Sequence, residues 1–302
     1  MFKIFNTLDP KQIISYQAPN GEVRNWYYEE YNAKENLLIT VGDSWTWGDH
    51  LGTIDWNQVY DDPVRIQTVY GKQLATKLDA DWILLANPGC SNYWMLEKLK
   101  FFSTQIHELK KQYNNIYIIV TLTEDLRECS YQQEWQYIAD YYSMLTNSVN
   151  LEDFLIKIEK KLFLEFQTLF DNLDVTSKIT RAFTDIWPVN KECLINYLLD
   201  KTWCDVFQDK IKFDRYYQVV PFIGQLSIDP LTEKYISALD NSQAAVFKND
   251  IIELEEKLRA RWNFLGASVY NLKGSTYHPN ADGHLLYANY LYKKLIYNEH
   301  IL

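Results

Sequence analysis

The chain has 302 residues, of which 47% are hydrophobic and 23% are charged, and its formal net charge is −10. This composition supports a substantial core and excludes an intrinsically disordered chain. The acidic excess argues against binding to nucleic acid, which needs clustered Lys and Arg, and against adhesion to anionic membrane surfaces. A neutral substrate or a protein partner fits this charge better.

No apolar stretch approaches the ~20 residues that are needed to cross a bilayer. The N-terminal segment lacks the apolar core and cleavage site of a signal peptide. We therefore expect synthesis in the cytoplasm and leave the final location open, since a virion-associated protein would look the same. The four cysteines show no CxxC spacing, so we interpret them as small buried residues: Cys90, Cys129, Cys193 and Cys204.

The first third of the chain predicts strands that alternate with helices. Residues 1–35 form a mixed, polar N-terminal extension with a turn at Asn20-Gly21. The first strand is predicted over residues 37–44, where an apolar run from Leu37 to Val41, typical of a buried parallel strand, breaks at Gly42-Asp43-Ser44. Helical spacing follows over residues 61–79, and a second short buried strand is predicted over residues 82–86. The apolar positions of the helix that can share one face are Ile66, Val69, Tyr70, Leu74 and Leu78.

A turn cluster over residues 87–92 follows the second strand, and Ser91 or Asn92 could cap the next helix. That helix is predicted over residues 93–113, and a third strand over residues 116–122. This order of strands and helices predicts a parallel sheet with right-handed crossovers.

Residues 131–230 are dense in aromatic side chains and mainly helical in periodicity, as over residues 151–170 and 189–201. The segment is too long for an ordinary crossover, so we interpret it as a helical insertion or cap, which could bind a protein partner. Its best candidate for a strand is residues 216–222.

The last part of the chain returns to alternating elements. A charged amphipathic helix is predicted over residues 241–264, a short strand over 267–272, a loop over 274–280 and a closing helix over 281–297. The predicted domain organisation is therefore an N-terminal extension (1–35), an α/β domain (36–130 and 231–302) and an insertion (131–230).

Polar residues follow the predicted strands. Ser44 comes directly after the first strand, the turn cluster after the second and residues 123–127 after the third, while His278 lies in the loop before the last helix. In an open parallel sheet these positions converge on one edge. A serine nucleophile needs a base within reach and donors for an oxyanion, and this edge could supply both. The alternative is that Ser44 only caps the following helix.

Four stretches resemble, in order and spacing, the four sequence blocks of the SGNH hydrolases, also called GDSL-type esterases and lipases. They are Gly42-Asp43-Ser44-Trp45, the cluster 87–92, residues 123–126 and residues 274–284. The resemblance covers about residues 36–128 and 242–297. It implies a three-layer, flavodoxin-like α/β fold with a parallel sheet, here with a large helical insertion. Phage genomes encode members of this kind, and this chain could be one.

The resemblance also implies roles. Ser44 would be the nucleophile and His278 the general base of a hydrolase that cleaves an O-acetyl or short acyl ester, on a carbohydrate in view of the many aromatic residues. The backbone N–H of Ser44 and that of Gly89 or Asn92 would bind the oxyanion. Asp43 is placed with the substrate-binding residues. We expect no cofactor and no metal, because the sequence has no phosphate loop and no metal-ligand spacing.

Two positions depart from the family pattern. Glu124 stands where the family has an oxyanion-hole asparagine, and an ionised carboxylate only accepts hydrogen bonds. Asn92 could supply the missing amide. Ser275 stands where the family has an aspartate, so a backbone carbonyl or another acid would have to orient His278. These departures support an alternative, an SGNH-like scaffold with a binding or structural role.

The remaining candidates each have two interpretations. Arg127 could bind substrate or form an ion pair with Glu124 or Asp125. Trp45 and Trp47 flank the nucleophile and could pack in the core or form a platform for a sugar or acyl group. His284 is expected to pack or cap within the last helix. His50 could line the mouth of the site or face solvent, and we interpret His107 as a surface residue.

Overall fold

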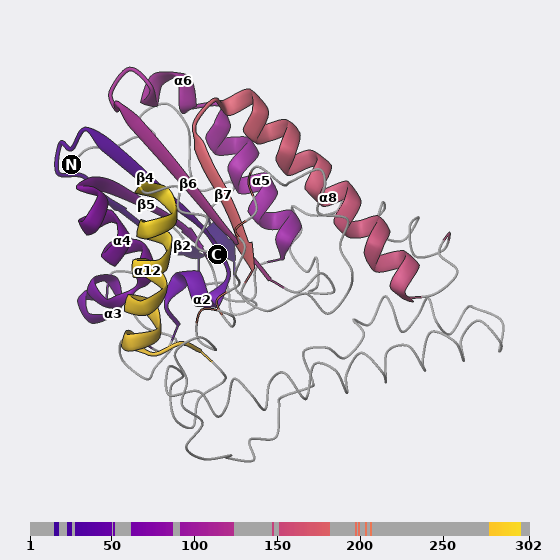
Figure 1. Cartoon of the computed structure of the whole chain (residues 1–302), viewed down its shortest axis with the longest axis horizontal. Helices are drawn as coiled ribbons and strands as arrows, with labels where there is room; N and C mark the ends of the chain where they lie inside the picture. Colours follow the sequence, from indigo (N-terminus) through magenta and orange to yellow (C-terminus); the bar gives the residue numbers. More distant parts are fainter. Residues whose placement is uncertain are drawn as a thin grey trace, which may run out of the picture.

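Figure 1 shows the computed structural model of the chain. The structure describes residues 15–17, 23–25, 28–49, 51, 62–86, 91–123, 147, 151–181, 197, 199, 203, 206 and 278–296.

A five-stranded sheet organises the molecule, in the order β3-β5-β4-β6-β7. The strands are β3 (Tyr28–Glu30), β4 (Asn36–Gly42), β5 (Ala80–Ala86), β6 (Asn115–Leu122) and β7 (Thr176–Arg181). All neighbours are parallel except β3, which pairs antiparallel with β5 at the edge. If the parallel strands β4, β5, β6 and β7 are numbered 1 to 4 along the chain, their order in the sheet is 2-1-3-4, as in flavodoxin-like folds. The three predicted strands and their parallel pairing are confirmed.

Helices cover both faces of this sheet, so the fold has three layers (Figure 1). On one side lie α3 (Pro63–Thr68), α4 (Tyr70–Leu78) and the closing helix α12 (Ala281–Ile296), with α12 packed on α4. On the other side lie α5 (Asn92–Ser103) and α8 (Leu151–Leu173), which pack on each other. None of the described helices is long and apolar enough to traverse a bilayer.

The covered faces explain the continuous apolar runs in the sequence. Leu38 of β4 and Leu84 of β5 belong to the core cluster under α4 and α12. Their neighbours Leu37 and Ile39, which point to the opposite face, are also fully buried. A strand that is buried on both faces has no polar side to alternate with.

The helix predicted over residues 61–79 forms as two helices. Asp62 caps α3 with its carboxylate, and Pro63 occupies the first helical position. At Val69 the backbone is extended, with φ −63° and ψ 145°, and α4 begins at Tyr70. All five residues of the predicted apolar face are nevertheless buried. The break frees the backbone N–H of Tyr70, which donates to a side chain of α12 instead.

The helix predicted over residues 93–113 is also divided, into α5 and the short α6 (Ile106–Leu109). Ser91 caps α5, as one of the two predicted alternatives, by accepting from the N–H of Trp94. β6 begins at Asn115, shortly after the end of the predicted helix.

The predicted insertion contributes to the sheet. α8 confirms the helix that was predicted over residues 151–170, but β7 lies within the same insertion and pairs with β6. Residues 151–181 are therefore part of the layered α/β domain and not of a separate cap. At the outer edge of β7, the backbone N–H of Ile179 donates to the carbonyl of Tyr197, and the Ile179 carbonyl accepts from the N–H of Leu199. This is the hydrogen-bond pattern of a parallel pair of strands.

Several predicted elements lie outside the described residues. These are residues 216–222, 241–264 and 267–272, most of 189–201, and the four cysteines. Within the N-terminal extension, β1 (Ser15–Gln17) and β2 (Val23–Asn25) pair antiparallel on either side of the predicted turn at Asn20-Gly21. β3 follows them as a strand that the sequence analysis did not predict.

The end of β4 requires a glycine. A Cβ atom on Gly42 would lie 2.0 Å from Thr46 Oγ1 and 2.6 Å from Thr46 Cβ, and Thr46 is fully buried. We expect Gly42→Ala to destabilise the protein by about 1–3 kcal/mol in urea unfolding, because the overlap must be relieved by moving the chain. The double variant Gly42→Ala/Thr46→Gly is expected to recover part of this loss. A Gly42→Ala protein as stable as the wild type would contradict the tight turn.

Candidate active site

The turn after β4 places Ser44 at the carboxyl edge of the sheet. Asp43 has an extended backbone and caps the short helix α2 (Ser44–Trp47) by accepting from the N–H of Trp45 at 3.0 Å. Gly48 ends the helix in the left-handed conformation, with φ 78°. Because Asp43 performs the capping, the alternative that Ser44 is the cap is wrong, and Ser44 is the first helical residue.

The Ser44 side chain is not used by the local fold. The residue is 7% exposed, and among the residues that the structure describes none forms a hydrogen bond with its hydroxyl, including His278. Hydrogen bonds of catalytic groups are often formed only when a substrate is bound. The Ser44 hydroxyl lies at the end of the central strand, β4.

His278 lies beside the turn that carries Ser44, and Asp49 connects the two. The backbone N–H of Asp49 donates to the Ser44 carbonyl at 3.0 Å. Its Oδ2 atom is 3.8 Å from His278 Nε2, and both side chains are nearly buried, at 12% and 11% exposure. The structure thus brings His278, from the segment before α12, to the end of β4. The sequence analysis did not propose Asp49; its only signal was an acid one turn after Ser44.

Asn92 connects the segments that follow β5 and β6. Its amide nitrogen donates to the Thr123 carbonyl at 3.0 Å, and its oxygen accepts from the Thr123 N–H at 2.8 Å. The side chain therefore holds the start of the segment that follows β6. This pair of bonds engages the amide that was predicted to help bind an oxyanion.

A buried polar group from α12 lies beneath the site. The backbone N–H of Tyr70 donates to His284 Nδ1 at 3.1 Å, so the proton of the neutral ring is on Nε2. Burial, and secondarily the charge of His278, lowers the pKa of His284 to about 3. His284 therefore packs in the interior as a neutral ring, one of its two predicted roles. Burial also raises the pKa of the Tyr70 hydroxyl to about 12, and this group contacts Thr121 Oγ1 at 3.2 Å.

The two tryptophans beside Ser44 pack in the interior. Trp45 is 3% exposed and makes an edge contact with Trp203, with ring centroids 5.5 Å apart. The Arg65 guanidinium lies 3.8 Å from the ring centroid of Trp47 and donates to its carbonyl. Of the two interpretations, packing fits these contacts and a substrate platform does not.

Four predicted site residues lie outside the described residues: Gly89, Glu124, Arg127 and Ser275. His50 also does, whereas His107 is exposed as predicted. Within the described ranges, no group of three or more His, Cys, Asp or Glu side chains is arranged to hold a metal ion.

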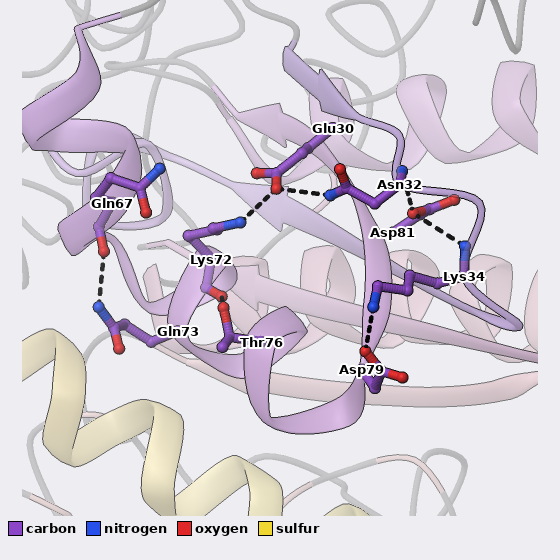
Figure 2. A network of polar contacts seen from close by, with 9 residues as sticks. All are labelled: Glu30, Asn32, Lys34, Gln67, Lys72, Gln73, Thr76, Asp79 and Asp81. Atoms are coloured by element: carbon purple, nitrogen blue, oxygen red, sulfur yellow. Dashed lines mark hydrogen bonds and ion pairs between the residues drawn. The ribbon is translucent and has the colours of Figure 1, made fainter.

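The polar network in Figure 2 lies near the start of β5, at the end of the sheet opposite to Ser44. Asp81 accepts from the backbone N–H groups of Asn32 and Lys34 and from the Tyr113 hydroxyl. Lys72 forms an ion pair with Glu30 of β3. These contacts attach the antiparallel edge strand to the sheet, so we interpret the network as structural.

No family model and no curated protein matches the chain. Solved structures with some similarity include a carbohydrate esterase whose active site displays divergent catalytic and non-catalytic binding functions. It has 13% identity and a TM-score of 0.37, covering 95% of this chain and 70% of that chain. Another is phospholipase A1 from Streptomyces albidoflavus NA297, with 14% identity and a TM-score of 0.33, covering 86% and 99%. Likeness at this level adds nothing to the strand order and the site described above.

Proposed function

We propose that the protein is a serine hydrolase of the SGNH type that cleaves an O-acetyl or short acyl ester, with a carbohydrate as the alcohol part. One observation carries the proposal. The Ser44 hydroxyl, which does not cap the helix, lies at the carboxyl end of the central strand, and His278 contacts the same turn through Asp49. The order of the four sequence blocks supports it independently.

The reaction proceeds in two acyl transfers. Ser44 Oγ attacks the ester carbonyl carbon while His278 takes its proton, and a tetrahedral oxyanion forms. The bond from that carbon to the alcohol oxygen then breaks, and His278 returns the proton to the leaving alcohol. Water next attacks the acyl group on Ser44 and gives a proton to His278. The bond to Ser44 Oγ breaks, the carboxylic acid leaves, and Ser44 recovers its proton.

Backbone donors are the proposed oxyanion hole. Ser44 supplies its own N–H at the start of α2, and Gly89 or Asn92 supplies a second from the segment after β5. A backbone donor needs no particular side chain, so it remains compatible with the engagement of the Asn92 amide by Thr123. Arg127 and Glu124 follow the third strand and are proposed to line the same edge.

A fluorophosphonate probe tests the nucleophile directly. We expect one covalent adduct on the wild-type chain, located on Ser44 by mass spectrometry of the peptides. Ser44→Ala should abolish the adduct and His278→Ala should slow its formation strongly. Ser103→Ala is the matched control, because Ser103 lies at the far end of α5 with its hydroxyl bonded to a carbonyl. An adduct elsewhere, or none on the wild type, would contradict the proposal.

The alternative is an SGNH-like scaffold that binds or assembles without catalysis, for example in a phage particle. It is favoured by the small exposure of both candidate residues, 7% for Ser44 and 9% for His278. A wild-type chain that resists the probe and hydrolyses no ester would support this second function. The rest of the predicted insertion, residues 131–150 and 182–230, would then be the first place to look for a protein partner.

A further inference from the structure

The proposed mechanism lacks an acid for its histidine. In Ser-His-Asp enzymes a carboxylate orients the imidazole and stabilises the imidazolium that forms when the serine loses its proton. The position where the resemblance implies that aspartate is Ser275. A backbone carbonyl or a carboxylate from another part of the chain would have to serve, and the structure places the carboxylate of Asp49 close to His278.

We propose that Asp49, from the turn after α2, is the positioning acid of His278. The inference rests on the proposed function and deepens it. It assigns the acid to the same turn as the nucleophile, not to the loop of the histidine, so one segment of eight residues from Gly42 to Asp49 supplies both. Its direct support is the 3.8 Å separation of Asp49 Oδ2 and His278 Nε2.

The backbone fixes the position of this carboxylate. The N–H groups of Gly48 and Asp49 both donate to the Ser44 carbonyl at 3.0 Å, and that of Leu51 donates to the Gly48 carbonyl at 3.2 Å. The left-handed Gly48 reverses the chain at this point. Asp49 is therefore tied to the residue that carries the nucleophile, and any movement of one would move the other.

The contact is electrostatic. A separation of 3.8 Å is too long for an N–H···O hydrogen bond, so Asp49 does not take the place of the serine hydroxyl at Nε2. Two opposite charges at this distance attract strongly when both are shielded from water, and the two side chains are 12% and 11% exposed. The carboxylate thus favours the imidazolium form, which arises in the reaction when the proton of Ser44 passes to His278.

Two titratable groups face His278 from the described elements around it. Asp49 does so from the turn after α2, and His284 from α12, where its interaction with His278 is electrostatic. His284 stays neutral above a pH of about 3, which its pKa sets. Asp282, in the first turn of α12, is exposed and has no contact with His278 among the described residues. Asp282→Asn is therefore a matched control that removes an equal charge nearby.

Kinetics on an ester substrate form the first test, with Asp49→Asn, Asp49→Glu and Asp282→Asn compared with the wild type. We expect Asp49→Asn to lower kcat about 10- to 1,000-fold while KM changes little, since the acid acts on a charge of the transition state. Asp49→Glu should restore part of the rate, and Asp282→Asn should resemble the wild type. Equal kcat values for Asp49→Asn and the wild type would overturn the inference.

The second test needs no activity. The ring signals of His278, assigned with His278→Gln, are followed by NMR as the pH is changed. Their titration midpoint is expected to fall by about one to three pH units in Asp49→Asn and to stay unchanged in Asp282→Asn. An unchanged midpoint in Asp49→Asn would show that the contact is absent. If Ser44→Ala hydrolyses as fast as the wild type, the proposed function fails, and the titration alone then decides whether Asp49 and His278 interact.

Discussion

Ser44→Ala and His278→Ala are each expected to lower kcat/KM for p-nitrophenyl acetate and for an O-acetylated glycan by about 10³- to 10⁶-fold. Without the hydroxyl no acyl-enzyme forms, and without the imidazole the hydroxyl keeps its proton. Because both residues act in the same step, the double variant should be no slower than the slower single variant. Steady-state rates of the wild type, the two single variants and the double variant measure this.

Matched controls separate this loss from damage to the fold. Ser103→Ala removes a serine that is remote from the site, and His107→Ala removes an exposed histidine of α6. Both should keep the wild-type rate. Equal rates in the wild type, Ser44→Ala and His278→Ala on both substrates would end the enzymatic proposal. Losses that multiply in the double variant would instead indicate that Ser44 and His278 act separately.

The sequence predicted the central strands well, because the physical signal is local. β4, β5 and β6 are short runs of apolar residues, and only a sheet covered on both faces buries such a run completely. The closing helix α12 was equally clear from its periodicity. The parallel pairing of these strands followed from the alternation of strands and helices, since helical crossovers join parallel strands.

Other features of the fold depend on contacts that are remote in sequence. The break at Val69 leaves the N–H of Tyr70 without a helical partner, and His284 supplies one from 214 residues away. β7 (Thr176–Arg181) has the sequence Thr-Ser-Lys-Ile-Thr-Arg with a single apolar residue, so it was included in the predicted insertion. Its pairing with β6 identifies it as a strand of the main sheet.

In the candidate site, too, local features were predicted and contacts between remote residues were not. The Gly-Asp-Ser block predicted a serine at the end of the first strand, and the structure places Ser44 there. No pattern in the sequence indicated that Asp49 would contact His278, because the two are separated by more than two hundred residues and meet only across the sheet edge. Similarly, the two hydrogen bonds between Asn92 and Thr123 depend on the placement of β5 and β6 on either side of β4.

His284 is expected to make the stability of the protein depend on pH. In the folded state its pKa is about 3, whereas in the unfolded chain it returns to about 6.5. Between these values the unfolded chain binds one proton more than the folded protein, so stability rises with pH and is lost as the pH falls. The loss between pH 7 and pH 5 should be about 2 kcal/mol, measured by urea unfolding at both pH values.

Two variants isolate this effect. His284→Asn removes the titrating group but keeps an oxygen that can accept from the Tyr70 N–H, while His284→Phe removes both the titrating group and the acceptor. In both variants the loss of stability between pH 7 and pH 5 should be smaller than in the wild type by about 2 kcal/mol, the part that is due to His284. The other titrating groups are common to all three proteins. At pH 7, His284→Phe should be less stable than His284→Asn by about 1–3 kcal/mol, because a buried N–H is left without an acceptor. If the wild type and both variants weaken equally from pH 7 to pH 5, the ring is not held neutral by burial between Tyr70 and Trp203.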